Sequence, residues 1–153
     1  MYSEMTLADI ENLNEDYPCQ LIVMLYDEAI AGLRATIAAI QSGDIEARCN
    51  ATSRVTEIVS HLYLALDMEQ GGEIAENLGR IYNLIIFQMP QVNFNNDAPM
   101  VAQMINLLLP LRNAWVDLDE RIRGSIQFAE DEDRRALAAE LVADDQMTTG
   151  APA

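Results

Sequence analysis

The sequence predicts an all-α protein, an antiparallel four-helix bundle in which the helices alternate in direction, up-down-up-down. The 153 residues include only seven Gly and five Pro, and these residues, with a few Asn and Asp, divide the chain into four long segments. Each long segment repeats its apolar residues with the period of an α-helix. The connections between the segments are short, and short connections favour antiparallel neighbours.

The first half of the chain is divided by Pro18 and by a glycine–aspartate turn. Residues 1–17 are a short, polar and acidic lead-in. Because proline is tolerated in the first turn of a helix, Pro18 is expected to begin a long helix that runs to about Gln41. Gly43 suits the left-handed residue that ends a helix, and Asp44 suits the N-cap of the next one.

The second and third helices are expected to meet at a pair of glycines. The second helix would run from about residue 45 to residue 70, where Gly71 and Gly72 end it. Glu73 then lies in the first turn of the third helix, where the helix dipole favours a negative charge. The third helix is expected to continue to about Asn93.

The fourth helix is expected over residues 98–123, after a turn rich in Asn and Asp. Beyond it the sequence is strongly acidic, with a weak helix expected only around residues 134–142. The sequence therefore predicts a bundle domain over residues 1–124, in which residues 1–17 form an N-terminal cap segment. An acidic, partly disordered C-terminal extension over residues 125–153 would follow.

Charge excludes several classes of partner. The chain carries 25 acidic residues against nine basic residues, which gives a formal charge of −16. Nucleic acid and anionic membrane surfaces both require a cationic face, so neither is expected as a partner.

The acidic N-terminal residues lack the pattern of a signal peptide, and no apolar run is long enough to span a membrane. We therefore expect a cytoplasmic protein without membrane insertion.

The number and spacing of the His, Glu and Cys residues do not match those of known types of metal or catalytic site. A di-metal site in a helical bundle needs two Glu-x-x-His pairs, whereas this chain has one histidine, His61, with Glu57 four residues before it. Cys19 and Cys49 do not have the spacing of a zinc site. No phosphate-binding loop or nucleophile motif is present. We expect no enzyme activity, no catalytic residue, no cofactor and no metal.

The chain carries more apolar residues than one core requires. The core-facing rows are expected to include Ile74 and Leu84 on the third helix and Leu107, Leu111 and Trp115 on the fourth. Second apolar rows lie on the first helix, with Tyr26, Ile30, Leu33 and Ile37, and on the fourth, with Val101, Ile105, Leu109 and Val116. Two interpretations remain open: the terminal segments cover these rows, or the rows form a groove for an amphipathic helix of a partner.

Three pieces of the sequence are characteristic of one family. They are LIVMLYDEAIAGLRATIAAIQSGDIEA at residues 21–47, LDMEQGGEIAENLGRIY at residues 66–82 and LLLPLRNAW at residues 107–115. Together, in this order and at this spacing, they resemble the flagellin-specific export chaperones, the FliS family, over about residues 16–124. The middle piece is similar to the family signature LD-x-E-x-GGEIA-x-NL-x-x-LY.

The resemblance implies a cytoplasmic chaperone that binds the disordered C-terminal segment of flagellin in apolar grooves. Such a chaperone prevents premature polymerisation and assists delivery to the flagellar type III export apparatus, so a component of the export gate is an expected second partner. Weak homodimerisation is left open. The alternative is a helical-bundle adaptor or regulatory protein that binds another flagellar partner or an anti-sigma factor.

The resemblance also assigns roles to residues. We expect flagellin to bind along the two second apolar rows, from Tyr26 to Ile37 and from Val101 to Val116. In relatives the N-terminal segment covers the groove, and the residues that would do so here are Tyr2, Met5, Leu7 and Ile10. Structural roles are expected for Gly71, Gly72 and Glu73, which would form the turn between helices, and for Trp115, which would anchor the core.

Overall fold

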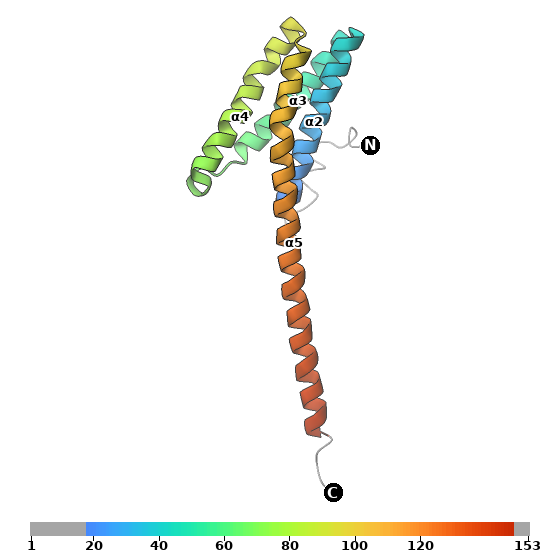
Figure 1. Ribbon diagram of the computed structural model, residues 1–153, viewed down its shortest axis with the longest axis vertical. Coiled ribbons are helices and arrows are strands. Elements are labelled where there is room, and N and C mark those ends of the chain that lie inside the picture. Colours follow the sequence, from blue (N-terminus) through green and yellow to red (C-terminus); the bar gives the residue numbers. More distant parts are fainter. Residues whose placement is uncertain (1–17, 149–153) are drawn as a thin grey trace. The chain divides into compact units, whose positions relative to one another are not determined.

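The computed structural model describes residues 18–148, and within them the side chains of residues 19–145. The chain divides into two compact units, Met1–Val116, here called the bundle unit, and Asp117–Ala153, here called the C-terminal unit. Every regular element in the described part of the chain is a helix (Figure 1). The four expected cap residues of the N-terminal segment lie outside the described residues.

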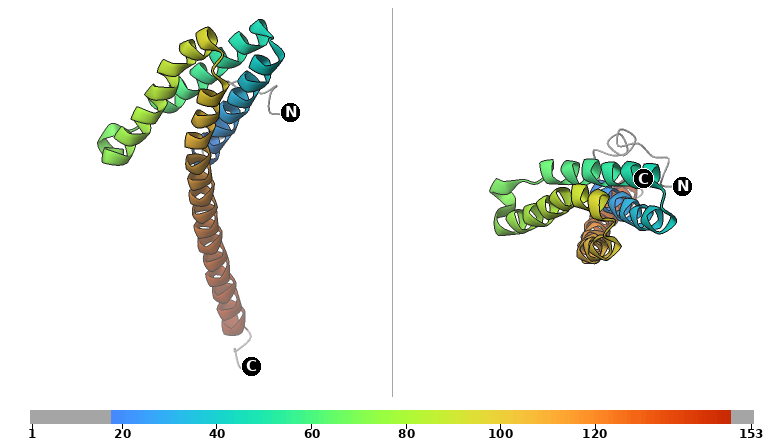
Figure 2. Two further views of the ribbon diagram at one scale, coloured as in Figure 1. Left: turned by 45° about the horizontal axis from the view of Figure 1, so that its top comes forward. Right: turned by 90° about the horizontal axis from the view of Figure 1, so that it is seen from above.

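Four helices form the described chain: α2 (Pro18–Ser42), α3 (Ile45–Leu64), α4 (Met68–Asn95) and α5 (Ala98–Thr148). In the bundle unit each helix runs opposite to the one before it, as Figures 1 and 2 show. This arrangement confirms the predicted all-α four-helix bundle. Helix α5 belongs to the bundle unit as far as Val116 and to the C-terminal unit from Asp117 onward.

The turn between α2 and α3 has the predicted chemistry. Gly43 has a φ of +69°, in the left-handed region that glycine adopts without a steric penalty. The Asp44 side chain accepts a hydrogen bond of 3.0 Å from the backbone N–H of Ala47. The aspartate therefore satisfies one of the unpaired amide groups at the start of α3.

The connection between α3 and α4 begins earlier than expected. Helix α3 ends at Leu64 rather than near residue 70, because Asp67 caps a new helix. The Asp67 carboxylate accepts hydrogen bonds of 3.1 Å from the backbone N–H groups of Glu69 and Gln70. One turn later Gly72, with φ 51° and ψ −128°, interrupts the helical backbone of α4. The chain therefore changes direction in two steps.

Replacement of Gly72 by alanine is expected to destabilise the bundle by about 1–3 kcal/mol, because a side chain strains this backbone conformation. Urea unfolding followed by circular dichroism would measure the loss. Gly124→Ala is the matched control, because a Cβ atom at Gly124 meets no atom within 4 Å. Equal stability of the Gly72→Ala variant and the wild type would show that the turn does not depend on this glycine.

Helix α2 contacts each of the other three helices. The Tyr26 hydroxyl is hydrogen-bonded to the Tyr82 hydroxyl of α4. The Asp27 carboxylate accepts a hydrogen bond of 2.8 Å from the Arg112 side chain of α5, and Glu28 lies 3.8 Å from Arg54 of α3. The broad apolar stripe of α2 is therefore used inside the bundle, where Tyr26, Ile30 and Leu33 are all buried.

The inward faces of α4 and α5 differ from those expected. Ile74, Leu84 and Leu107 were expected in the core, but they are 72%, 46% and 39% exposed. The helices are rotated slightly from the expected orientation, so that part of each expected row faces inward together with residues of the neighbouring row. The inward-facing residues are Ala75, Leu78, Tyr82, Ile85, Met89 and Val92 on α4, and Val101, Met104 and Leu108 on α5. Where apolar residues occupy adjacent rows of a helix, the period alone does not decide which row is buried.

The C-terminal unit continues α5 beyond its expected end near residue 123, and the helix runs to Thr148. Gly124 does not end it, since the following residues are mainly good helix formers. Ion pairs one turn apart join Arg123 to Asp119 at 3.2 Å and Arg134 to Asp131 at 3.9 Å. The domain boundary at residue 124 and the partial disorder of the extension in solution stay predictions.

Candidate functional site

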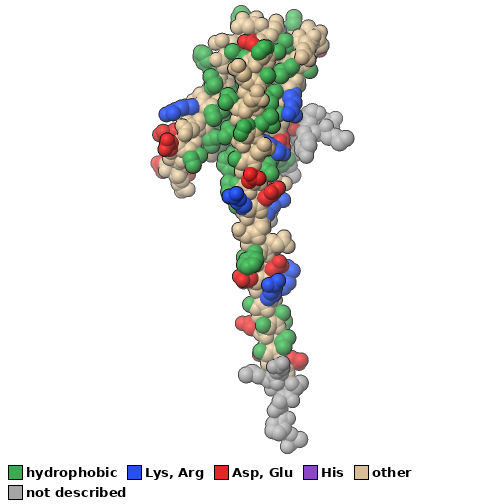
Figure 3. Space-filling view, viewed as in Figure 1, with side chains coloured by type: hydrophobic (Ala, Val, Ile, Leu, Met, Phe, Trp, Pro, Cys, Tyr) green, Lys and Arg blue, Asp and Glu red, His purple; other side chains and the backbone are tan. Residues whose placement is uncertain are grey.

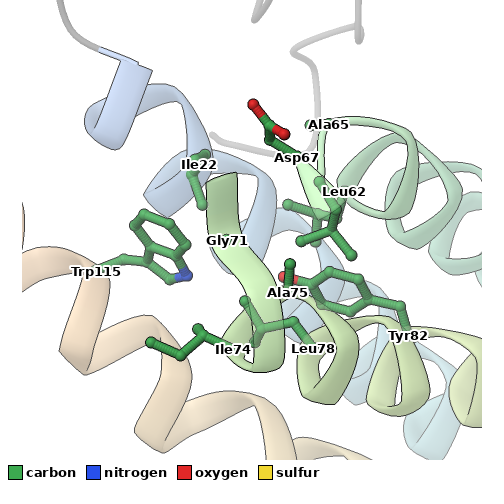
Figure 4. Close-up of a pocket in the computed structure, with 11 residues that line it drawn as sticks. Ile22, Leu62, Ala65, Asp67, Gly71, Ile74, Ala75, Leu78, Tyr82 and Trp115 are labelled. Carbon is green, nitrogen blue, oxygen red and sulfur yellow. The ribbon is translucent and has the colours of Figure 1, made fainter. Parts of the chain in front are cut away.

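A cavity of about 270 Å³ lies at one end of the bundle unit (Figure 4). Helix α4 supplies five of the lining residues, the loop between α3 and α4 supplies three, and α2, α3 and α5 supply one each. The lining residues are Ile22, Leu62, Ala65, Leu66, Asp67, Gly71, Ile74, Ala75, Leu78, Tyr82 and Trp115. The walls are therefore almost entirely apolar.

Most of the lining comes from the segment LDMEQGGEIAENLGRIY. Its residues from Leu66 to Tyr82 approach the cavity from the loop and from the first turns of α4. In Figure 4 the Trp115 ring faces the cavity from α5, opposite Ala75 and Tyr82. The two most characteristic sequence pieces, around Gly71 and around Trp115, therefore meet at one hollow.

The one charge among the described lining residues belongs to Asp67. Its carboxylate caps α4, and Figure 4 shows it at the edge of the cavity, away from the Trp115 ring. No pair of titratable groups therefore faces a common point inside this hollow. Its chemistry is suited to holding apolar side chains.

A buried hydrogen-bonded group supports the cavity wall. The hydroxyls of Tyr26 and Tyr82 are hydrogen-bonded, and their rings are 6.2 Å apart between centroids. Burial raises the pKa of both tyrosines, and their mutual hydrogen bond raises the pKa of Tyr82 further. The nearby Trp115 indole opposes part of the pKa shift of Tyr26. Both phenols are therefore neutral at physiological pH, and they link α2 and α4.

A second hollow, of about 370 Å³, lies between α2 and α5. Asp27, Ile30, Ala31, Arg34, Leu109 and Arg112 line it. The Arg112 guanidinium bridges to both Asp27 carboxylate oxygens, at 2.8 and 3.4 Å. This two-point contact fixes the distance between α2 and α5, and it places charged groups beside the apolar side chains of Ile30 and Leu109.

The eight residues expected to line a groove occupy two environments. Tyr26, Leu33 and Val101 are 0% exposed and Ile30 is 4% exposed, so these four side chains belong to the core. Ile37, Ile105, Leu109 and Val116 are half-buried. Of the eight, Ile30 and Leu109 meet at the hollow between α2 and α5. The assignment of this set to flagellin binding stays a proposal.

The residues expected to have structural roles lie at the first cavity. Gly71 and Trp115 line it, and Gly72 supplies the break in α4 beside it. Glu73 is exposed. Trp115 is half-buried and packs against the core while one side of its ring contacts the cavity.

Sequence reasoning missed several cavity residues. Ile22, Leu62, Leu66, Ile74 and Tyr82 were assigned to the core or given no role. A signal was present, because three of them lie within the characteristic segment at residues 66–82. The glycine-containing turn in this segment was expected to have only a structural role, although residues of the same segment also line the cavity.

Further apolar side chains are exposed on α4. Besides Ile74, they include Leu84, Phe87 and Phe94, and Phe94 is 90% exposed. In Figure 3, hydrophobic side chains gather over α5 and the adjoining side of α4. Apolar side chains that are clustered at the surface mark a site of interaction more often than scattered ones do.

Glu28 is the acidic residue buried among the described side chains. It is 6% exposed, and its Oε1 atom has no hydrogen-bond partner. Burial raises the pKa of the Glu28 carboxyl, and the nearby Arg54 opposes this shift. The carboxyl lies in the α2–α3 interface and lines neither hollow.

Within residues 18–148, no cluster of three or more His, Cys, Asp or Glu side chains is arranged to hold a metal ion. The described helices also include none with the length and apolar character needed to cross a membrane.

Comparison with known proteins identifies the family. The family model described as Flagellar protein FliS matches residues 6–121. The chain belongs to the FliS family. The flagellar secretion chaperone FliS of Salmonella typhimurium is 35% identical over 105 residues, which cover 68% of this chain and 78% of that protein.

Two further FliS relatives agree. The flagellar secretion chaperone FliS of Vibrio cholerae is 33% identical over 98 residues, which cover 64% of this chain and 72% of that protein. The flagellar secretion chaperone FliS of Campylobacter jejuni is 34% identical over 98 residues, which cover 64% of this chain and 77% of that protein. The FliS match includes both hollows and ends at residue 121, so most of the C-terminal unit lies beyond it.

Proposed function

We propose that this chain is a cytoplasmic flagellar secretion chaperone that binds the disordered C-terminal segment of flagellin. In this proposal the segment becomes helical against the apolar hollows of the bundle unit. Binding prevents premature polymerisation and assists delivery to the flagellar type III export apparatus. The observation that carries the proposal is that the most characteristic FliS-like residues, from Leu66 to Tyr82 and at Trp115, line one open apolar cavity.

The size and position of the hollows support binding of an extended partner. Both hollows share α5 as a wall, through Trp115 in one and through Leu109 and Arg112 in the other. A disordered segment that folds on binding must bury on the order of 1,000–3,000 Å² to offset its lost entropy. One cavity is too small for this, whereas a helix that reaches both hollows and the exposed side chains of α4 offers a suitable area.

Apolar contact is the main source of affinity in this proposal. The cavity offers Ile22, Ile74 and Trp115 to a ligand, and its one carboxylate is engaged in capping α4. The arrangement supplies no group positioned for acid–base or nucleophilic catalysis at this hollow. Binding and release of a protein segment, without a chemical step, is the function that this surface supports best.

Co-purification with flagellin from the same organism tests the proposal. Tagged chaperone is mixed with full-length flagellin or with flagellin that lacks its C-terminal segment. Retention of the full-length form alone is the expected result. Equal retention of both forms would exclude the C-terminal segment as the ligand. Loss of both would favour the alternative, an adaptor that binds another flagellar partner or an anti-sigma factor.

A further inference from the structure

The C-terminal unit presents an apolar face that packs against nothing in its own unit. Leu118, Ile122 and Ile126 are 42%, 39% and 39% exposed, and Leu137 is 58% exposed. At 100° per residue these four side chains lie within roughly 60° of Ile122 around the helix axis. Ala129 and Ala136 lie between them on the same side. Together with Asp133, which lies between Ile126 and Leu137 on the same side, they form one stripe of apolar and acidic side chains, here called the extension face.

The extension face also carries negative charge. Asp119, Asp133 and Glu140 lie within roughly 60° of Ile122, whereas all four arginines of the unit lie about 100° or more away. Asp119 is paired with Arg123, so Asp133 and Glu140 supply most of the charge next to the apolar side chains. Across the whole unit ten acidic residues stand against four arginines.

The family match covers only the first residues of this face, Leu118 and Asp119. The match to FliS ends at residue 121, before Ile122 and Ile126. Neither hollow of the bundle unit includes a residue of the C-terminal unit. A merely solubilising helix would need no apolar stripe, and several exposed large apolar side chains along one side of a helix favour contact with another protein.

We propose that the extension face docks a basic amphipathic helix of another protein. Such a helix would place leucine-like side chains against Leu118, Ile122 and Ile126, with Lys or Arg beside Asp133 and Glu140. The face from Leu118 to Leu137 is about 30 Å long at 1.5 Å per residue. That length accommodates a partner helix of about 20 residues, which would bind with its apolar side on the face.

Charge favours this occupant over three others. A second copy packed in parallel on the same face would bring Asp133 and Glu140 close to like charges, which destabilises helix pairing. The N-terminal residues 1–17 of this chain carry five acidic residues and no arginine, so they would be repelled in the same way. Nucleic acid is disfavoured by the same charge.

A designed peptide tests the docking surface with the full-length chain. The probe is a fluorescent helix of about 25 residues with leucine opposite the apolar side chains of the face and lysine at the positions that would meet Asp133 and Glu140. A second probe has glutamate in place of lysine. Fluorescence anisotropy is expected to show binding of the lysine probe, weakened by added salt, and no binding of the glutamate probe.

Paired variants locate the binding on the helix. Ile122→Asp with Ile126→Asp is expected to weaken binding of the lysine probe about tenfold or more. Phe128→Asp with Val142→Asp makes the same chemical change at two exposed positions on the other side of the helix, and it is expected to leave binding unchanged. Asp133→Asn with Glu140→Gln is expected to weaken binding at low salt and to reduce its salt dependence.

Three results would overturn the proposal. The first is that the lysine probe still binds after the Ile122 and Ile126 substitutions, and the second is that the glutamate probe binds as well as the lysine probe. The third is that the chain forms a dimer and that the Ile122 and Ile126 substitutions abolish it, because a second copy would then be the occupant. Flagellin binding is measured in parallel with the same variants and is expected to be unchanged. The docking surface and the proposed chaperone function can therefore fail separately.

Discussion

Replacement of Ile74 by aspartate is expected to weaken flagellin binding about tenfold or more, which is at least about 1.4 kcal/mol of binding free energy. Ile74 lines the cavity and is 72% exposed, so the substitution puts a carboxylate where the ligand would bury an apolar side chain. Burying that charge without a partner is costly. Because Ile74 is mostly exposed, bundle stability is expected to change by no more than about 0.5 kcal/mol. Titration calorimetry and urea unfolding would measure the two effects.

Leu64→Asp is the matched control. Leu64 is 79% exposed at the end of α3 and lines neither hollow. The same change in size and charge is expected to leave flagellin affinity unaltered there. If Ile74→Asp and Leu64→Asp bound flagellin as tightly as the wild type, the cavity would not be the binding site. If both lost binding equally, general surface charge would explain the effect.

Replacement of Gly32 by leucine is expected to cost about 3 kcal/mol of unfolding free energy. A Cβ atom at Gly32 would lie 2.7 Å from Cγ2 of Val55, which is 0% exposed in the core. Helices α2 and α3 pack closely at this point because glycine has no side chain. A larger residue must push them apart and disturb the buried side chains around Val55. Urea unfolding of the full chain would measure the loss.

Gly124→Leu is the control for this substitution. Gly124 also lies within a helix, but a Cβ atom there meets nothing within 4 Å. Leucine is the better helix former by up to about 1 kcal/mol, so this variant is expected to be as stable as the wild type or more stable. A Gly32→Leu variant as stable as Gly124→Leu would show that α2 and α3 are not in close contact at Gly32.

The fold was largely predictable because local and global signals agree. Gly43 and Asp44 end one helix and cap the next as expected. Gly72 interrupts the helical backbone where glycine was expected to do so. The start of α4 was missed because Asp67 lies between apolar residues, and its capping role depends on a backbone turn that periodicity does not reveal.

The site was less predictable because periodicity does not distinguish adjacent apolar rows. On α2 the second row was expected at a groove, yet Tyr26 and Leu33 are buried because α2 contacts the other three helices. On α4 and α5 the reverse occurred, since Ile74 and Leu107 were expected in the core and are exposed. The rotation of each helix depends on long-range contacts such as the hydrogen bond between Tyr26 and Tyr82.

The characteristic sequence pieces contribute to the candidate site as well as to the fold. Gly71 and Trp115 were expected to serve the fold alone, whereas both contact the cavity. A glycine-containing turn places Ile74, Ala75 and Leu78 where one helix begins, next to the end of another. One short segment can therefore set the path of the chain and shape a surface for a partner.

Titration calorimetry of this protein with the C-terminal segment of flagellin from the same organism, combined with circular dichroism, tests the central claim most directly. We predict one-to-one binding, a large negative heat-capacity change from burial of apolar surface, and a gain of helix beyond the sum of the separate components. Absence of binding, with the helical signal of the bundle intact, would contradict the account.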